Sequence, residues 1–98
     1  MTYSFTARVW EWSGKASWFF VSVPEEQADD IEERYGRRAA GFGSIRVEVT
    51  IGASTWRTSL FPSNEEKTYV LPLKKAVRTA EGLGAGSTAT VELVVVAD

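Results

Sequence analysis

Three cationic residues, Lys74, Lys75 and Arg78, share one face of a predicted helix that begins near Pro72. Cations at a helix start oppose the macrodipole, which favours anions there by roughly 0.3–1 kcal/mol, and no acid follows them before Glu81. The functional interpretation is an anion site built from these charges and the unpaired N–H groups of the first turn. The ordinary interpretation, which we favour, is a solvated charged face.

A second polar group belongs to a predicted hairpin whose turn is Gly52-Ala53. Arg57 and Ser59 share one face of the returning strand, and Arg46 and Glu48 are expected across from them. On the inner face of a barrel such side chains would need partners and could line a pocket. On the outer face they would form cross-strand pairs, which is the interpretation we favour. The complete set of candidate ligand-binding residues is Arg46, Arg57, Ser59, Lys74, Lys75 and Arg78.

Trp10, Trp12 and Trp18 gather around another predicted hairpin. Tyr3 and Val9 supply the inward face of its first strand, so Trp10 and Trp12 should face the other way. We expect them to pack under the first helix. If they are exposed instead, the three tryptophans would form a surface for a partner or for stacking.

The chain contains neither Cys nor His. Disulfides, thiolate metal sites and nucleophilic catalysis of the Ser-His-Asp or Cys-His kind are therefore excluded within one chain. Carboxylates alone rarely build zinc sites, and we predict no metal and no cofactor. An enzyme would have to work with carboxylates, Lys, Tyr or a borrowed cofactor, and we predict no catalytic residue.

Length and charge narrow the class of protein further. With 98 residues the chain has room for one domain, 1–98, with one core. Six of the 13 acidic residues lie between Pro24 and Gly36, where only one base, Arg34, accompanies them. The small basic excess elsewhere does not indicate nucleic-acid binding. The first residues alternate polar and apolar side chains, unlike a signal peptide, so we expect a cytoplasmic protein.

The elements that must position these residues follow from periodicity. Apolar residues that alternate with a period of two predict strands at 2–12, 17–23, 44–51, 54–61, 67–71 and 88–97. The fourth of these ends because Pro62 breaks it. Pro24 and Pro72 open two helices that stop at Gly36 and Gly82. The predicted class is mainly β with two helices, a small split β-barrel in the order β-β-α-β-β-β-α-β.

The chain resembles the DUF1905 family, small bacterial domains whose biochemical role is not established. The resemblance rests on Trp10 or Trp12, Gly14-Lys15, Trp18–Val21, Pro24, Ile51-Gly52, Trp56–Leu60, Pro62, Leu71–Arg78 and Gly86. It implies a split β-barrel with helices outside. The family usually has Asp after the glycine equivalent to Gly86, where this chain has Ser87.

Residues 70–93 are also similar to the strand, Pro, short helix, Gly, strand pattern of AbrB-type swapped-hairpin transcription factors. That resemblance implies a nucleic-acid-binding dimer, whereas this chain has enough strands for a full barrel of its own. We therefore predict a non-catalytic binding module for a small anionic ligand or a protein partner. A nucleic-acid-binding dimer is the alternative, and an enzyme is the third possibility.

Overall fold

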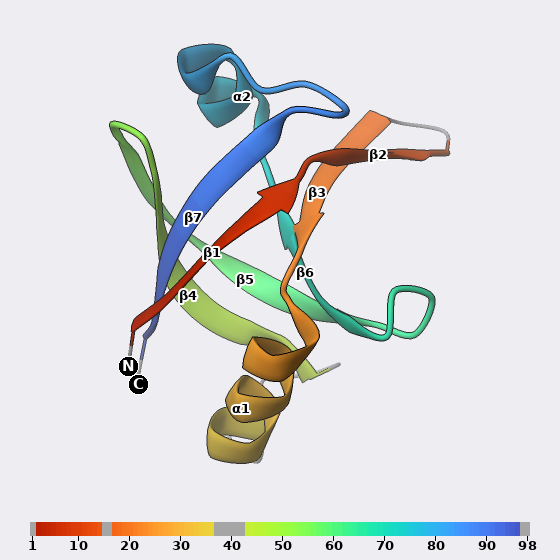
Figure 1. Ribbon diagram of the computed structural model, residues 1–98, viewed down its shortest axis with the longest axis vertical. Helices are drawn as coiled ribbons and strands as arrows, with labels where there is room; N and C mark the ends of the chain where they lie inside the picture. The colour runs from red at the N-terminus through yellow and green to blue at the C-terminus, as the bar shows by residue number, and fades with distance from the viewer. Residues whose placement is uncertain (1, 15–16, 37–42, 97–98) are drawn as a thin grey trace.

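A curled antiparallel sheet of seven strands makes up most of the described chain (Figure 1). The computed structural model describes residues 2–14, 17–36 and 43–96. The strands are β1 (Thr2–Arg8), β2 (Trp10–Ser13), β3 (Ser17–Ser22), β4 (Ile45–Ile51), β5 (Ser54–Ser63), β6 (Thr68–Pro72) and β7 (Thr88–Val95), and the helices are α1 (Glu25–Tyr35) and α2 (Lys75–Glu81). This confirms the mainly β class, the split β-barrel and the order of elements.

The sheet consists of two half-sheets. Its strand order is β1-β7-β4-β5-β6-β3-β2, with every pairing antiparallel. β5 belongs to both halves, because Ser54–Leu60 pairs with β4 and Phe61–Ser63 pairs with β6. The two outermost strands, β1 and β2, are consecutive in the chain and are separated by one residue, Val9. The bend at Val9 therefore connects the two ends of the sheet at one corner of the split barrel, although no strand pairing joins β1 to β2 among the described residues.

The bend at Val9 is held by the turn before β7. The Val9 N–H donates to the Ser87 carbonyl at 2.8 Å, and the Val9 carbonyl accepts from the Gly86 N–H at 2.8 Å. Its side chain is only 1% exposed, so the chain turns here with both backbone groups hydrogen-bonded and the apolar side chain buried. The prediction of one strand over 2–12 was wrong in this respect, because alternation continues through Val9 while the pairing partner changes.

The contacts of Ser87 show how a serine can stand where the family resemblance leads one to expect aspartate. Its hydroxyl accepts a hydrogen bond from the Gly84 N–H at 3.0 Å, and its own N–H donates to the Gly84 carbonyl at 3.0 Å. Gly86 has a φ of 87°, which favours glycine. A serine oxygen can thus accept the hydrogen bond that an aspartate oxygen would accept at the same place.

Pro62 does not end its strand, contrary to the prediction. It lies within β5 and pairs with Tyr69 of β6. The last pair between β5 and β4 is Leu60 with Ile45, so β5 has only one neighbour beyond that point. A missing N–H is tolerated where the strand has a free side, and proline can therefore remain in the strand here.

The core fills the space between the two half-sheets. Alternate residues of β4 point into it, and all four apolar residues predicted to do so are buried: Ile45, Val47, Val49 and Ile51. The return strand adds Leu60, which has no exposed surface, and β7 adds Ala89, Val91 and Leu93. Gly52 has a φ of 58° in the two-residue turn between β4 and β5, as the sequence predicted.

α1 covers one end of the barrel and α2 lies beyond the other end (Figure 1). Ala28 and Ile31 of α1 belong to the core. Tyr3 of β1 donates from its hydroxyl to Asp30 Oδ2 at 2.6 Å, and Arg34 Nε donates to the same carboxylate at 3.0 Å. These two donors lower the pKa of Asp30, whereas burial raises the pKa of Tyr3. A polar contact thus fastens the helix to the first strand.

α2 begins later than predicted. Pro72 is the last residue of β6, and the helix runs from Lys75 to Glu81 with Lys74 at its N-cap. Only Val77 of this helix is buried, so two of the apolar positions in the predicted stripe, Ala76 and Ala80, are exposed. The left-handed stop at Gly82 is confirmed by its φ of 66°, whereas Gly36 at the end of α1 is right-handed. Neither helix is long and apolar enough to span a membrane, within the part of the chain described.

Tyr3→Phe should lower the melting temperature by a few degrees near neutral pH, because it removes the hydrogen bond to the Asp30 carboxylate. The folded-state pKa of Asp30 is depressed, so this stabilisation is present above the ordinary carboxyl pKa of about 4 and is lost as the pH falls through the folded value. Thermal melts of both proteins between pH 7 and pH 2.5 should therefore converge on the acid side. Melting curves that stay equally far apart at every pH would contradict this.

Gly52→Ala should destabilise the fold by about 1–3 kcal/mol. A Cβ there requires an unfavourable backbone and would overlap the carboxylate of Glu81, which accepts a hydrogen bond from Ser54 Oγ at 2.7 Å. Gly84→Ala is the matched control, because its Cβ meets open space and its φ is not positive. Urea unfolding should leave that control within about 1 kcal/mol of the wild type. Equal losses in the two variants would show that the turn at Gly52 has no special role.

Candidate functional site

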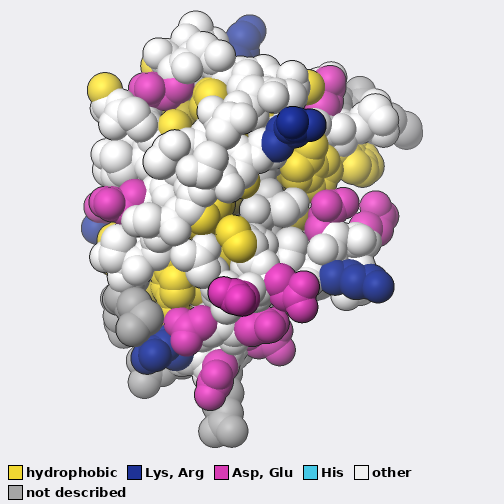
Figure 2. Space-filling model, in the orientation of Figure 1, with side chains coloured by type: hydrophobic (Ala, Val, Ile, Leu, Met, Phe, Trp, Pro, Cys, Tyr) yellow, Lys and Arg dark blue, Asp and Glu magenta, His cyan; other side chains and the backbone are white. Residues whose placement is uncertain are grey.

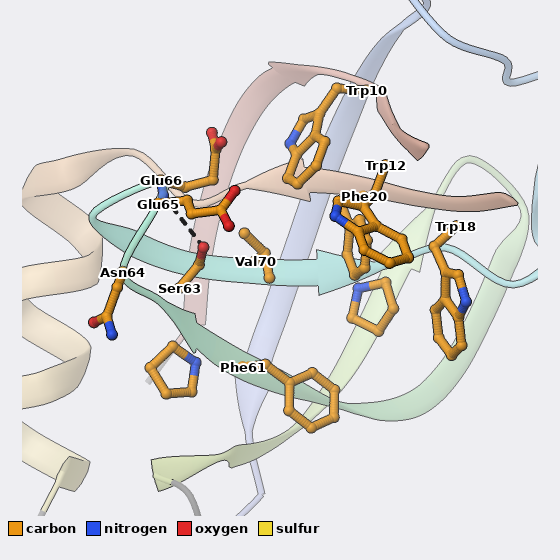
Figure 3. Close-up of a pocket in the computed structure, with 12 residues that line it drawn as sticks. Trp10, Trp12, Trp18, Phe20, Phe61, Ser63, Asn64, Glu65, Glu66 and Val70 are labelled. Carbon is orange, nitrogen blue, oxygen red and sulfur yellow. Dashed lines mark hydrogen bonds between the residues drawn. The ribbon is translucent and has the colours of Figure 1, made fainter. Parts of the chain in front are cut away.

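A groove of about 520 Å³ lies on the outer face of the half-sheet β5-β6-β3-β2. We call it the aromatic groove, and define it by Trp10, Trp12, Trp18, Phe20, Phe61 and Val70. Figure 3 shows Trp10, Phe20 and Trp12 along one side, Phe61 on the other, and Val70 between them. Its volume falls in the range of ligand-binding sites, roughly 300–1,000 Å³.

Strand pairing sets the aromatic rings beside one another. Trp10 lies opposite Phe20 and Trp12 opposite Trp18 in the β2–β3 hairpin. The Trp10 and Phe20 ring centroids are 5.0 Å apart, and the Trp18 and Phe20 rings stack with centroids 6.3 Å apart. Trp10 Nε1 donates to Ser22 Oγ at 2.9 Å, which fixes that indole. The wall of the groove is therefore ordered by contacts within the protein.

Three of the aromatic side chains, Trp12, Trp18 and Phe61, are exposed, and the expectation that Trp10 and Trp12 pack under the first helix was wrong. Trp12 is 46% exposed, Trp18 53% and Phe61 44%. α1 contacts β6 and contributes to the core, while the groove is lined by strands β2, β3, β5 and β6 and by the β5–β6 turn. The β2–β3 hairpin extends to the side of the barrel away from α1 (Figure 1), so its outer face receives no cover from that helix.

Gly14 allows Trp12 to lie where it does. A Cβ at this position would overlap the six-membered ring of the Trp12 indole, so that any other residue would push the ring aside. At the floor of the groove Val70 is 6% exposed although it does not belong to the core cluster. The groove is thus a second, smaller apolar assembly on the opposite side of the same strands.

One end of the aromatic groove is acidic. Glu65 and Glu66, in the β5–β6 turn, line this end and are exposed. The Glu66 N–H donates to Ser63 Oγ at 3.2 Å, and Lys67 has a φ of 56°, a left-handed conformation within the turn. Figure 2 shows hydrophobic side chains over the β2–β3 hairpin, with acidic side chains below them. We call Glu65 and Glu66 the acidic end.

The other end of the groove continues into a smaller hollow of about 180 Å³. Trp18 and Pro72 line both, and the hollow adds Arg57 and Lys74, which we call the basic end. Lys74 is exposed, and Arg57 bonds Glu48 with an Nε–Oε2 distance of 3.4 Å. Such a surface pair contributes little to stability, so the Arg57 guanidinium remains able to meet another anion.

The other two cations that the sequence grouped with Lys74, namely Lys75 and Arg78, have different surroundings. Arg78 lies 4.0 Å from the centroid of the Phe19 ring and donates to the Leu73 carbonyl at 3.1 Å, so it is committed to packing. Lys75 is exposed on the first turn of α2. Because α2 begins at Lys75, Lys74 belongs to the cap, and the three cations do not form the helical face that the sequence predicted.

The hairpin residues face outward. Arg46 lies opposite Ser59 and Glu48 opposite Arg57, which confirms the predicted cross-strand pairing. Arg46 and Arg57 are exposed and Ser59 is half-buried, so none of them lines the barrel interior. Glu48 faces Val94 on its other side and not Glu92, and the described residues contain no group of acids placed to hold a metal ion.

Sequence reasoning missed Phe61 and Val70 of the aromatic groove and both residues of its acidic end, Glu65 and Glu66. Phe61 alternates with Ser59 and Arg57, a pattern that places it on the outer face once Pro62 is accepted as a strand residue. Val70 lies opposite Phe61 in the register of β5 and β6. No sequence signal gives that register, and hence none could bring these side chains to the tryptophans.

Acrylamide should quench the tryptophan fluorescence of the wild-type protein strongly, because Trp12 and Trp18 are about half exposed. In the double variant Trp12→Phe/Trp18→Phe the emission comes from Trp10 and Trp56, which are half-buried, and the Stern–Volmer slope should fall markedly. Trp56→Phe is the control and should leave the slope at least as steep. An unchanged slope in the double variant would show that these two rings are covered in solution.

Comparison with known proteins yields one result. A family model described as "Domain of unknown function (DUF1905)" matches residues 5–93, nearly the whole chain. A search of the curated proteins found no match.

Proposed function

The chain belongs to the DUF1905 family, and we propose that it is a non-catalytic, cytoplasmic binding module that holds an extended segment of a partner protein in the aromatic groove. The observation that carries the proposal is the exposure of Trp12, Trp18 and Phe61 around one trough. Contiguous exposed aromatic surface is costly in water and marks sites of interaction. Tryptophan is also among the residues that contribute most to protein interfaces.

The dimensions of the groove favour a segment over a whole protein face. A stable interface between folded proteins buries roughly 800 Å² on each partner and calls for a broad, complementary surface. The aromatic groove is instead a trough of about 520 Å³ that lies along β6, between the tryptophan wall and Phe61. A short segment with successive apolar side chains fits such a trough and can fill it without a second folded domain.

Charge argues against the other ligands that the sequence suggested. Glu65 and Glu66 at the acidic end would repel a phosphate backbone, although stacked aromatic rings alone would suit single-stranded bases. A small anion would find only Arg57 and Lys74 at the far end, and Arg78 is engaged with Phe19. A polypeptide segment is the ligand that best matches a groove with an apolar centre, an acidic end and a basic end.

A library of random 12-residue peptides displayed on phage tests the proposal. Selected sequences should be rich in apolar residues and should bind the purified domain as synthetic peptides, with titration followed by tryptophan fluorescence. Trp18→Ala and Phe61→Ala should each weaken binding about tenfold or more, because they remove exposed walls of the groove without touching the core.

Val94→Ala is the matched control. Val94 is another exposed apolar side chain, 37% exposed, but it belongs to β7 on the other half-sheet, and its loss should leave the affinity unchanged. Failure to select any peptide that distinguishes wild type from Trp18→Ala would overturn the proposal. So would self-association that Trp18→Ala abolishes, because the occupant of the groove would then be a second copy of the chain.

A further inference from the structure

Resting on the proposed function, the geometry points to one class of segment: a proline-rich stretch in the polyproline II conformation, with a basic residue at one end and an acidic residue at the other. The basic residue meets the acidic end, Glu65 and Glu66, and the acidic residue meets the basic end, Arg57 and Lys74. Three features of the described residues carry this inference, namely backbone pairing, indole donors and charge.

The floor of the groove is the face of a sheet, formed by β3 and β6. β3 is paired with β2 and with β6, and β6 is paired with β5, so the backbone groups beneath this floor are already engaged. A segment that lies over the floor therefore cannot add a strand to β3 or β6, and side chains must make the contacts there. Polyproline II segments are recognised in this way by aromatic-lined grooves, and they lose little conformational entropy on binding.

Indole donors favour the same conformation. Trp10 Nε1 is bonded to Ser22, whereas Trp12 and Trp18 have no acceptor for their indole N–H within residues 2–14, 17–36 and 43–96. Both rings line the groove, and Figure 3 shows the Trp12 nitrogen on the side of its ring toward Val70, whereas the Trp18 nitrogen lies on the side away from it. A polyproline II backbone has no internal hydrogen bonds, so each carbonyl is free to accept. A helix has already engaged its carbonyls, apart from the last turn, and would leave the Trp12 donor unused.

The length of the groove defines the size of the segment. The trough lies along β6, a strand of five residues that ends at Pro72. At about 3.3 Å per residue, the four steps from its first to its last Cα cover about 13 Å. Polyproline II rises about 3.1 Å per residue, so about four steps, or five residues, span the same distance. A charge just outside each end of that stretch would reach the acidic end and the basic end respectively.

The two charged ends are sufficiently free to select a ligand. Glu65 and Glu66 are exposed, and neither takes part in an ion pair within the described residues, where the pairs are Arg34 with Asp30 and Arg57 with Glu48. Lys74 is exposed as well. Exposed ion pairs each contribute roughly 0–1 kcal/mol, so the charges set preference while the aromatic rings supply most of the affinity.

The test uses four synthetic peptides, capped at both termini: Lys-Lys-Pro-Pro-Pro-Pro-Pro, Pro-Pro-Pro-Pro-Pro-Glu-Glu, a peptide with both charged ends, and a matched peptide whose prolines are replaced by Gly and Ser. Affinities are measured by fluorescence titration at low salt. The doubly charged proline peptide should bind most tightly. The affinity of the Gly/Ser peptide should be lower by about tenfold or more, because this peptide lacks apolar contacts and must be ordered on binding.

Charge-neutral variants assign the ends. Glu65→Gln/Glu66→Gln should weaken the two Lys-containing proline peptides about two- to fivefold and spare the one that carries only Glu. Arg57→Gln/Lys74→Gln should do the reverse. Both preferences should fade in 1 M salt, while binding through the rings persists.

Each outcome addresses a different part of the argument. Equal binding of the proline and Gly/Ser peptides, or charge variants that affect every peptide alike, would overturn the polyproline inference. If Trp18→Ala still weakened phage-selected peptides, the proposed function would stand. If Trp18→Ala changed the binding of no peptide, both would be wrong. Selected peptides that bind as helices, seen by circular dichroism, would also overturn this inference.

Discussion

The bend at Val9 is the constraint on which the rest of the molecule depends. A seven-stranded sheet has two edges, and each edge carries unpaired backbone groups. Here the same stretch of chain forms both outermost strands, and the residue between them satisfies both of its backbone groups at the Gly86-Ser87 turn. These two hydrogen bonds fix the place where the chain passes from one half-sheet to the other, and Val9 itself belongs to the core that the half-sheets share.

The bend also decides what lies on the outer face of the half-sheet β5-β6-β3-β2. β2 leaves the barrel after the bend, so the β2–β3 hairpin has an inner face near the core and an outer face directed to solvent. Val21 and Val23 occupy the inner side, and the tryptophans consequently occupy the outer one. β5 crosses between the half-sheets at Leu60 and brings Phe61 to the same outer face. The aromatic groove is thus a result of two strand crossings and not of any one local motif.

Charged side chains divide into those that hold the fold and those that remain available. Asp30 and Arg78 make contacts between elements, Arg34 bonds Asp30 within α1, and Ser54 with Glu81 joins α2 to the β4–β5 hairpin. Glu65, Glu66 and Lys74 lie around the aromatic groove in exposed positions. This division explains why a run of cations in the sequence is a poor guide to a site. Of its three members, Arg78 packs on Phe19, and Lys74 precedes the first residue of the helix.

The sequence by itself determined the strands, the turns and the direction of their faces. Alternation from Ile45 to Ile51, the glycine at 52 and the stop at 82 act over a few residues, so local sterics and the period of two are sufficient to fix them. It also indicated that Trp10 and Trp12 turn away from the core. Only the tertiary structure decided what lies on that side, because the pairing of Phe61 with Val70 and the path of α1 depend on contacts between distant segments. The predicted strand end at Pro62 and the predicted helix start at Pro72 were wrong for the same reason. Whether a missing N–H is costly depends on whether a neighbouring strand needs it, and a single sequence does not specify which strands are neighbours.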